Sequence, residues 1–407
     1  MKRIKITALL LIITLLGGCS NYAAEVNDKA YIIALGVDEG ENGLLKVTFM
    51  FAYPSGTGGE SGGEKIDKKD IVTVEAPSIY SGMRLLDTFK SKRIDTNHTK
   101  LVVFSQKLAE KRGVFSYISD LVSTRGFRPS IYVCVSQQAP SKLLSSMEPK
   151  QDSYIEKYIE HLFSKVADSG TSRAYLYNNY FSIIAGEGGY ILPLVGVTDK
   201  EEAKDAGEDY PFKKPDDFAL NYTADEIPLH GNSVAALSGQ AVFVDNRMVG
   251  TLGFMENTIV KLLEKDMFVG PFCVLVPETE SYANIELRQI SKPIITVDTG
   301  PVPIVNINIK LWGEYTGIGR SFKNREDYDN FVAYLNSAFS AKIIELMERT
   351  KTEFGADILG FADNAKINFL RYQDWVDYDW KEKYKNAQFN VSVNVDMNDY
   401  SELQFSP

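Results

Sequence analysis

The segment YIIALGVDEGENGLLKVTFMF, residues 31–51, predicts two strands joined by a short turn. Residues 31–37 form an apolar run that is typical of a buried strand. Residues 38–43 are the acidic, glycine and asparagine residues that favour a turn. From Leu45 to Phe51 apolar side chains alternate with Lys46, Thr48 and Met50, as expected for a strand that returns beside the first. We therefore expect a β-hairpin at the start of the fold.

Strands and helices alternate after this hairpin. Further strands are expected at residues 71–74, 101–104 and 131–135, and helices at residues 77–90 and 108–122. This order favours a mixed sheet with helices packed against it. A helical region then begins at Pro140, and apolar residues at helix spacing from Ile155 to Val166 indicate a helix that faces a core.

The C-terminal third combines strands with one long helix. Residues 233–244 and 247–252 predict a hairpin, because Asp245-Asn246 between them suits a two-residue turn. A strand at residues 191–195, broken at Pro193, precedes it. Apolar residues that recur every four positions predict a long amphipathic helix along residues 324–352. A short helix is expected at residues 258–265, and strands at residues 273–276, 283–287, 294–298, 304–315 and 389–395.

The expected fold is α+β and multidomain, because 407 residues exceed the usual size of one domain. Each folded part is expected to contain a mixed or antiparallel sheet packed with helices. We expect three parts after residues 1–18: an N-terminal α+β domain at residues 19–140, a middle region of helices and an acidic loop at residues 141–232, and a C-terminal α+β domain at residues 233–407 that opens with the hairpin of residues 233–252.

The composition is that of a globular protein with an excess of acid. Hydrophobic residues make up 44% and charged residues 24%, and the formal net charge is −10. This charge argues against a nucleic-acid partner, which needs a cationic face. It also argues against attachment to anionic lipid by charge alone. Three cysteines exclude a disulfide scaffold, and three histidines leave little for a zinc site.

The N-terminus is typical of a secretory signal. Three basic residues among the first five precede residues 6–16, which are apolar apart from two threonines. Such a span is too short for a transmembrane helix, which needs about 20 apolar residues. It has the length of a signal-peptide core. Leu16-Gly17-Gly18-Cys19 follows and resembles the lipobox of bacterial lipoproteins.

The lipobox resemblance implies that residues 1–18 are removed and that Cys19 carries an S-diacylglycerol and an N-acyl group. More than one acyl chain gives stable anchoring, whereas one chain is marginal. The alternative is an ordinary cleaved signal with a cysteine nearby by chance. Removal of the three basic residues changes the net charge from −10 to −13. The bilayer is therefore an expected partner through Cys19.

No motif for catalysis is present. His98, His161 and His230 form no His-Glu-x-x-His arrangement, and a turn role for His98 is favoured over a general base. No Gly-x-Ser-x-Gly nucleophile motif occurs. Gly-Glu-Gly-Gly at residues 186–189 is too short for a dinucleotide fingerprint and follows a helix. We expect no catalytic, cofactor-binding or metal site.

Four other features have a functional and a structural interpretation, and the structural one is favoured for each. The glycine-rich residues 54–65 read as a surface loop rather than a phosphate cradle. The acidic residues 199–226 read as a solvated loop rather than a metal site. Cys134 and Cys273 read as buried thiols rather than a disulfide. The cluster from Asp374 to Trp380 reads as a plug at a core edge rather than a cation or sugar site.

Four segments carry a family resemblance in chain order. They are residues 25–28 with 34–38, residues 98–105 with 108–109 and Gly113, residues 238–243 with Asp245 and 248–250, and residues 354–361 with Trp375 and Trp380. With the lipobox, they resemble the Ger(x)C family of spore germination lipoproteins, the C subunits of nutrient germinant receptors. Two departures are local. Ser20-Asn21-Tyr22 stands where the family usually has a tryptophan, and residues 400–407 lack an expected glycine.

The motif residues have structural interpretations of their own. Gly36 and Asp38 suit a strand that ends in a turn. Gly239 suggests a bulge or a close backbone approach within a strand. Gly355 and Asp357 suggest a helix break followed by the N-cap of a new helix.

The resemblance implies a non-enzymatic, three-domain α+β subunit on the outer face of the spore's inner membrane. It would dock with an integral membrane A subunit and a transporter-like B subunit, and the complex would trigger germination. Two other functions stay open from the residues alone: a solute-binding lipoprotein of a transporter, and a lipid-anchored hydrolase.

Overall fold

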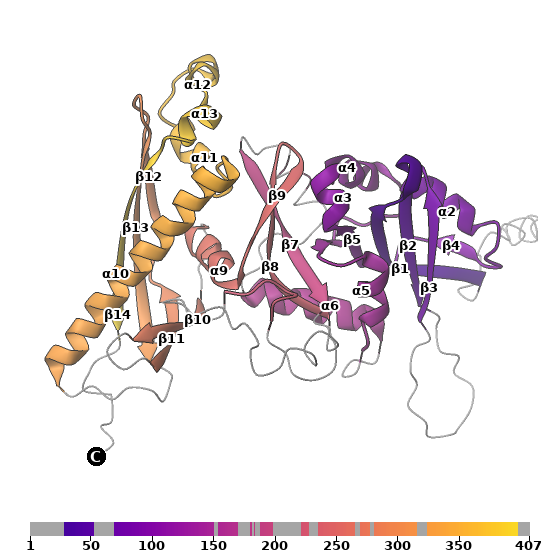
Figure 1. Cartoon of the computed structure of the whole chain (residues 1–407), viewed down its shortest axis with the longest axis horizontal. Coiled ribbons are helices and arrows are strands. Elements are labelled where there is room, and N and C mark those ends of the chain that lie inside the picture. The colour runs from indigo at the N-terminus through magenta and orange to yellow at the C-terminus, as the bar shows by residue number, and fades with distance from the viewer. Residues whose placement is uncertain are drawn as a thin grey trace, which may run out of the picture.

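The computed structural model describes residues 28–52, 69–149, 154–169, 180, 183, 188–197, 221–227, 235–264, 269–276, 281–315 and 324–397. Within these residues the chain forms two sheets packed with helices, which lie side by side along the long axis of the molecule (Figure 1). The expected α+β architecture is confirmed. Cys19, the glycine-rich residues 54–65, His230 and most of the acidic residues 199–226 lie outside the described residues.

The larger sheet starts with the hairpin expected at residues 31–51. In it β1 (Lys29–Glu39) pairs antiparallel with β2 (Leu45–Ala52). The strand order is β3-β2-β1-β5-β6-β7-β8-β9, with β4 beside β1. Along the path from β1 through β5 and β6 to β7 the neighbours are parallel, and so are β1 and β4. The other pairs are antiparallel, so the sheet is mixed as expected. Its other strands are β3 (Lys69–Ala76), β4 (Arg93–Asp95), β5 (Leu101–Ser105), β6 (Tyr132–Ser136), β7 (Gly189–Val197), β8 (Ala235–Val244) and β9 (Arg247–Leu252).

Helices cover both faces of this sheet. One face packs against α2 (Ile79–Leu86), α3 (Gln106–Lys111) and α4 (Phe115–Ser123), and the other against α5 (Pro140–Ser146) and α6 (Ile155–Ser169). Strands buried on both faces are continuously apolar rather than alternating. This explains the apolar run of residues 31–37, in which Leu35 belongs to one core and Ala34 to the other.

Two local expectations are wrong. The helix expected at residues 108–122 is two helices, α3 and α4, because Gly113 between them adopts a left-handed φ of 75°. The expected break at Pro193 is absent. Strand β7 continues through this residue, which lies opposite Gln240 of β8. The lost N–H of proline is tolerated beside an irregular register between Pro193 and Val195.

The hairpin of β8 and β9 is confirmed. Its turn residues Asp245 and Asn246 have φ angles of 47° and 65°, as a two-residue turn with primed geometry requires. The interpretation of Gly239 is also confirmed, since its φ is 83° and a Cβ there would lie 2.3 Å from the carbonyl oxygen of Leu252.

The same hairpin extends the larger sheet beside β7 instead of starting a separate sheet. Its two faces serve two cores. Ala241 and Phe243 pack in the core of the larger sheet, whereas Val242 and Leu252 pack with the smaller sheet. The division of the chain at residues 140 and 232 stays a prediction.

The smaller sheet has the path β10-β11-β13-β12, with β14 parallel to β13 on its free side. The long helix α10 (Arg325–Arg349) crosses one face, continues as a π-helical turn at Thr350–Phe354 and ends at Gly355 with φ 64°. The other elements are α9 (Phe254–Leu263), β10 (Val269–Val276), β11 (Ser281–Gln289), β12 (Ile294–Asp298), β13 (Ile304–Tyr315), α11 (Phe361–Lys366), α12 (Tyr372–Tyr378), α13 (Trp380–Tyr384) and β14 (Gln388–Met397).

Helix α10 also closes part of the edge of β14. The Val395 N–H donates to Oδ1 of Asn336 at 2.8 Å, and the Val393 N–H donates to Oγ of Ser340 at 3.3 Å. Two backbone donors that an incoming strand would use are therefore occupied by helix side chains.

Candidate functional site

Several polar contacts join the larger sheet to the smaller one. We call this region the junction. It comprises the β8–β9 hairpin, the start of α9, the C-terminal end of α10 and the segment from Gly355 to Trp380. Long-range hydrogen bonds and ion pairs meet there from sequence positions about 90 to 140 residues apart.

The two turn residues of the hairpin reach toward opposite sides of the junction. Oδ1 of Asn246 accepts a hydrogen bond from the Phe115 N–H at 2.8 Å and one from the Tyr190 hydroxyl at 3.2 Å. Val114, the N-cap residue of α4, offers no side-chain acceptor, so Asn246 satisfies the first N–H of that helix. Asp245 instead pairs with Lys381 of α13, with 2.6 Å between Oδ1 and Nζ.

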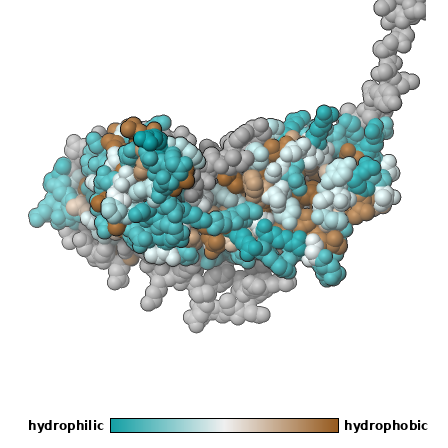
Figure 2. Space-filling model, turned by 90° about the horizontal axis from the view of Figure 1, so that it is seen from above, coloured by the Kyte–Doolittle hydropathy of each residue, from teal (hydrophilic) through white to brown (hydrophobic). Residues whose placement is uncertain are grey.

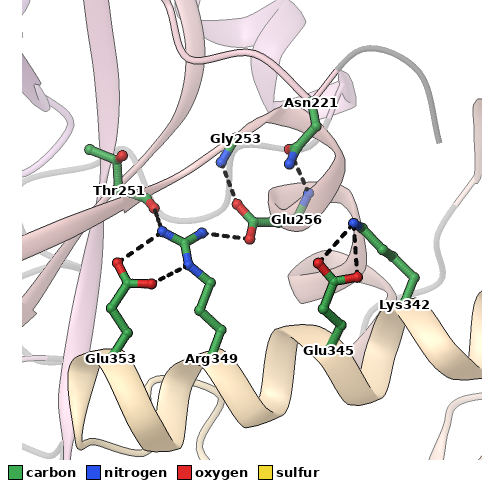
Figure 3. A network of polar contacts seen from close by, with 8 residues as sticks. All are labelled: Asn221, Thr251, Gly253, Glu256, Lys342, Glu345, Arg349 and Glu353. Atoms are coloured by element: carbon green, nitrogen blue, oxygen red, sulfur yellow. Dashed lines mark hydrogen bonds and ion pairs between the residues drawn. The ribbon is translucent and has the colours of Figure 1, made fainter. Parts of the chain in front are cut away.

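Arg349, in the last turn of α10, links this helix to α9 and β9 (Figure 3). Its Nη1 lies 2.6 Å from Oε1 of Glu256, and its Nη2 donates to the Thr251 carbonyl at 3.0 Å. The guanidinium also donates to Glu353, from Nε to Oε2 at 2.6 Å and from Nη2 to Oε1 at 3.1 Å. Burial by itself lowers the pKa of Arg349, but the hydrogen bond to Glu353 and the charge of Glu256 raise it above its ordinary value.

Glu256 has a second role in the same network. Its other oxygen accepts the Gly253 N–H at 2.8 Å, which caps the start of α9, and its own N–H donates to Oδ1 of Asn221 (Figure 3). Helix α10, helix α9 and strand β9 are thus joined through one carboxylate and one guanidinium.

Asp357 organises the turn that follows α10. Its carboxylate accepts the N–H groups of Gly360 at 2.9 Å and Ala362 at 2.7 Å, and the indole N–H of Trp380 at 3.0 Å. Burial raises the pKa of Asp357, while these donors favour its charged form. The expected helix break at Gly355 is confirmed, but the expected N-cap position at Asp357 is wrong, because Gly360 is the residue that immediately precedes α11. The Asp357 carboxylate instead reaches the Ala362 N–H of α11 from three residues before Gly360.

Glycines allow the two sheets to approach closely at the junction. A Cβ on Gly188 would lie 2.5 Å from the carbonyl oxygen of Asp357, and one on Gly250 would lie 2.6 Å from the ring of Phe354. Gly188 belongs to the Gly-Glu-Gly-Gly motif of residues 186–189. Close packing against the turn after α10 therefore explains this glycine without a nucleotide.

The junction holds its parts together, and its charged groups face one another. Glu256 is paired with Arg349, Asp245 with Lys381, and Asp357 with backbone and indole donors. In the described part of the chain, no group of three or more histidine, cysteine, aspartate or glutamate side chains is placed to hold a metal ion. The paired groups dock these elements against one another.

The sequence features with a functional interpretation are not brought together. His98 lies exposed in the turn before β5, edge-on to the Tyr31 ring with centroids 4.7 Å apart, and His161 lies exposed on α6. Cys134 of β6 and Cys273 of β10 are free thiols in different sheets, and burial raises the pKa of each. Cys19, the expected lipid site, lies outside the described residues.

The tryptophans of residues 374–380 lie in a core. Trp375 and Trp380 are each 3% exposed and stack with ring centroids 6.1 Å apart, while the aspartates at positions 374, 377 and 379 are exposed. The favoured interpretation, a plug at a core edge, fits this geometry.

Sequence reasoning missed the contacts of Arg349, Glu256 and Asn246. The turn Asp245-Asn246 and the glycines were detectable as local signals. The partners of Asn246 and Arg349 come from distant strands and helices, so no short motif contains them.

Among the helices that the structure describes, none is long and apolar enough to cross a membrane.

Comparisons with known proteins agree along most of the chain. The family described as "Spore germination protein N-terminal domain" matches residues 22–197, and "Spore germination B3/ GerAC like, C-terminal" matches residues 238–401. A similar relative is spore germination protein GerQC of Bacillus cereus, 21% identical over 377 residues and 91% of each chain. Spore germination protein KC of Bacillus subtilis (strain 168) is 24% identical over 159 residues, 37% of this chain and 39% of the relative.

A solved structure shares the fold. The crystal structure of the GerBC protein matches with a TM-score of 0.52 over 90% of this chain and 97% of that chain, at 15% sequence identity. The gap between the two family matches falls between β7 and the middle of β8, which are neighbours in one sheet.

Proposed function

Since the chain belongs to the Ger(x)C family of spore germination proteins, we propose that it is the lipid-anchored C subunit of a nutrient germinant receptor. In this proposal it is not an enzyme. It docks with the membrane A and B subunits of the receptor, and the assembly triggers germination. The observation that carries the proposal is the match of both family domains, in order, over residues 22–197 and 238–401.

The anchor is the second element of the proposal. Cys19 carries the S-diacylglycerol and N-acyl groups, and residues 1–18 are removed. The sequence Leu16-Gly17-Gly18-Cys19 after a short apolar core supports this assignment. The proposed location is the outer face of the spore's inner membrane, where the acyl chains supply the attachment that a net charge of −13 on the processed chain opposes.

The architecture supports an interaction subunit over the solute-binding alternative. Solute-binding proteins with two lobes are expected to repeat one α/β topology. Here the larger sheet is covered on both faces, whereas the smaller one is largely antiparallel with a single long helix. Among the residues that the structure describes, no specific observation favours a solute site.

The anchor is tested by labelling in sporulating cells with a radioactive fatty acid. The unaltered chain and Cys273→Ala are expected to take up the label and to sediment with membranes. Cys19→Ala is expected to lose the label and to appear in the fraction that membranes do not retain. Full membrane retention of unlabelled Cys19→Ala would contradict the proposed anchor.

The receptor role is tested by deletion of the gene in a strain without a paralogue. We expect loss of germination on the nutrients that the receptor serves, with no change in germination by agents that bypass receptors. Restoration by the unaltered chain and not by Cys19→Ala would connect both parts of the proposal. Normal germination of the deletion strain on every nutrient would contradict it.

A further inference from the structure

We infer that Tyr80, Leu85, Phe89, Lys92 and Arg93 lie against anionic lipid headgroups, beside the acyl chains of Cys19. We call these residues the α2 surface. The inference rests on the proposed lipid anchor and adds an orientation to it. The end of the larger sheet that carries α2 and β4 faces the bilayer, and the smaller sheet lies away from it.

Large apolar side chains of the α2 surface are exposed. Tyr80 is 62% exposed, Leu85 42% and Phe89 55%. The opposite face of the helix, with Ile79 and Leu86, is buried on β2 and β3. The outward face is thus free of the packing that fixes the helix, and exposed apolar groups of this kind mark binding surfaces.

The charge around these side chains differs from that of the whole chain. Residues 79–93 contain four basic residues and one acid, a net charge of +3, in a chain whose net charge is −10. Arg84 pairs with Asp87, and Lys90 with Asp70, at the border of the α2 surface. Aromatic and aliphatic side chains among lysine and arginine are typical of segments that lie in the headgroup region.

The position of the α2 surface is compatible with the anchor. Lys29, at the start of β1, lies opposite Arg93 of β4 in the sheet. Cys19 precedes Asp28, the first described residue, by nine residues, which reach at most about 30 Å when fully extended. Figure 1 shows α2 and β4 together at one end of the molecule. The acyl chains therefore enter the bilayer within reach of this end.

A second exposed apolar group gives a control. Ile367, Leu370, Tyr372 and Val376 lie on and between α11 and α12 and are 48% to 102% exposed. Figure 1 places α12 with the smaller sheet, far from α2. Figure 2 shows hydrophobic residues among hydrophilic ones on both parts of the molecule, so exposure alone does not distinguish the two surfaces. The α2 surface is distinguished by its basic residues and by its closeness to Cys19.

The test uses the full-length acylated chain in vesicles of phosphatidylglycerol and phosphatidylcholine, the latter brominated in its acyl chains. Tryptophan is introduced as Phe89→Trp or, as the control, Leu370→Trp. The three native tryptophans, at positions 312, 375 and 380, give the same background in both. We expect Phe89→Trp to lose about half of its added emission, because interfacial side chains reach the headgroup and acyl boundary. Leu370→Trp is expected to lose none.

The charge contribution is measured in the same assay. Lys92→Glu together with Arg93→Glu, in the Phe89→Trp chain, is expected to reduce the quenching, as is replacement of phosphatidylglycerol by phosphatidylcholine. Protein that stays with the vesicles while Phe89→Trp is no more quenched than Leu370→Trp would overturn the inference and leave the anchor standing. Protein that does not stay with the vesicles at all would overturn the anchor and the inference together.

Discussion

Asn246 takes part in two structural features at once, a tight turn and the cap of a distant helix. It occupies the second position of a tight turn with a left-handed φ of 65°, and its amide oxygen caps a helix that begins 131 residues earlier. Asparagine suits both tasks, because it tolerates the left-handed region and carries a short acceptor.

The cap of Asn246 can be tested with two variants that keep its backbone conformation accessible. Asn246→Gly retains the left-handed turn but removes the acceptor, and we expect it to lower the free energy of unfolding by about 1 kcal/mol, the usual contribution of a capping side chain. Asn246→Asp keeps an acceptor oxygen and is expected to stay close to the unaltered chain. Urea unfolding measures both. Equal stability of Asn246→Gly and the unaltered chain would show that the cap contributes nothing.

Glu39 provides a pH dependence. Its carboxylate accepts a hydrogen bond from Lys111 and lies 3.6 Å from Arg112, and the Lys111 contact lowers its pKa below the ordinary value of 4.5. A carboxylate with a lowered pKa in the folded state stabilises that state above its ordinary pKa and loses this contribution as the pH falls through the lowered value. We expect Glu39→Gln to be less stable than the unaltered chain at neutral pH, with the difference shrinking in acid below pH 4.5. Unfolding curves at both conditions decide this, and a pH-independent difference would contradict it.

At the scale of elements, two glycines end helices with similar backbone angles but different surroundings. Gly113 has φ 75°, and a Cβ there would lie 1.8 Å from the carbonyl oxygen of Asn246. Gly355 has φ 64°, and a Cβ there would meet nothing within 4 Å. Gly113 is therefore required both for its left-handed backbone and for the close approach of Asn246, whereas Gly355 is required only for its left-handed backbone.

This difference predicts unequal costs for the same substitution. Gly355→Ala is expected to destabilise the protein by about 1 kcal/mol, the cost of a left-handed alanine. Gly113→Ala adds a clash with backbone and is expected to cost at least about twice as much, since the hairpin turn must move. Thermal unfolding of the two variants gives the comparison. Equal losses would mean that the hairpin turn moves aside without cost.

The elements predicted correctly from the sequence are those determined by residues that are close together in the chain. Strands at residues 294–298 and 304–315 and the turn at Asp245-Asn246 follow from alternation and turn chemistry, and the structure has them at the same bounds. The helix expected at residues 108–122 was wrong because its apolar spacing continues across Gly113, where the chain adopts a left-handed φ and lies close to the distant turn at Asn246.

The candidate site divides in the same way. The lipobox at Cys19 is a contiguous motif, so the sequence alone could propose it. The junction could not be proposed, because Arg349 meets Glu256 and Thr251 across 93 and 98 residues of chain. Nothing local to Arg349 distinguishes it from Arg325 at the start of the same helix.

At the scale of the molecule, Arg349 and Arg325 make a matched pair for the coupling of the two sheets. Arg349→Ala removes contacts to α9 and β9 and leaves Glu256, 10% exposed, without its cation. We expect a loss of about 2 kcal/mol, less than for a fully buried pair because Arg349 is 30% exposed. Arg325→Ala breaks an exposed pair with Asp329 and a contact of the guanidinium with the Tyr328 ring, and it is expected to cost under about 1 kcal/mol.

Calorimetry shows which of the two sheets loses stability in Arg349→Ala. The unaltered chain is expected to unfold in one transition, because the hairpin belongs to both cores. Arg349→Ala is expected to lower the melting temperature of the smaller sheet first and to broaden or split the transition. An effect no larger than that of Arg325→Ala would show that the ion pair does not couple the sheets.

The two-faced hairpin also limits how the length of this chain can change in evolution. Neighbouring residues of β8, such as Val242 and Phe243, belong to different cores. The insertion or deletion of one residue in β8 would exchange its two faces and present each core with the side chains shaped for the other. Relatives of this protein should therefore vary in loop length on both sides of the hairpin and keep the number of residues between Gly239 and Leu252 constant.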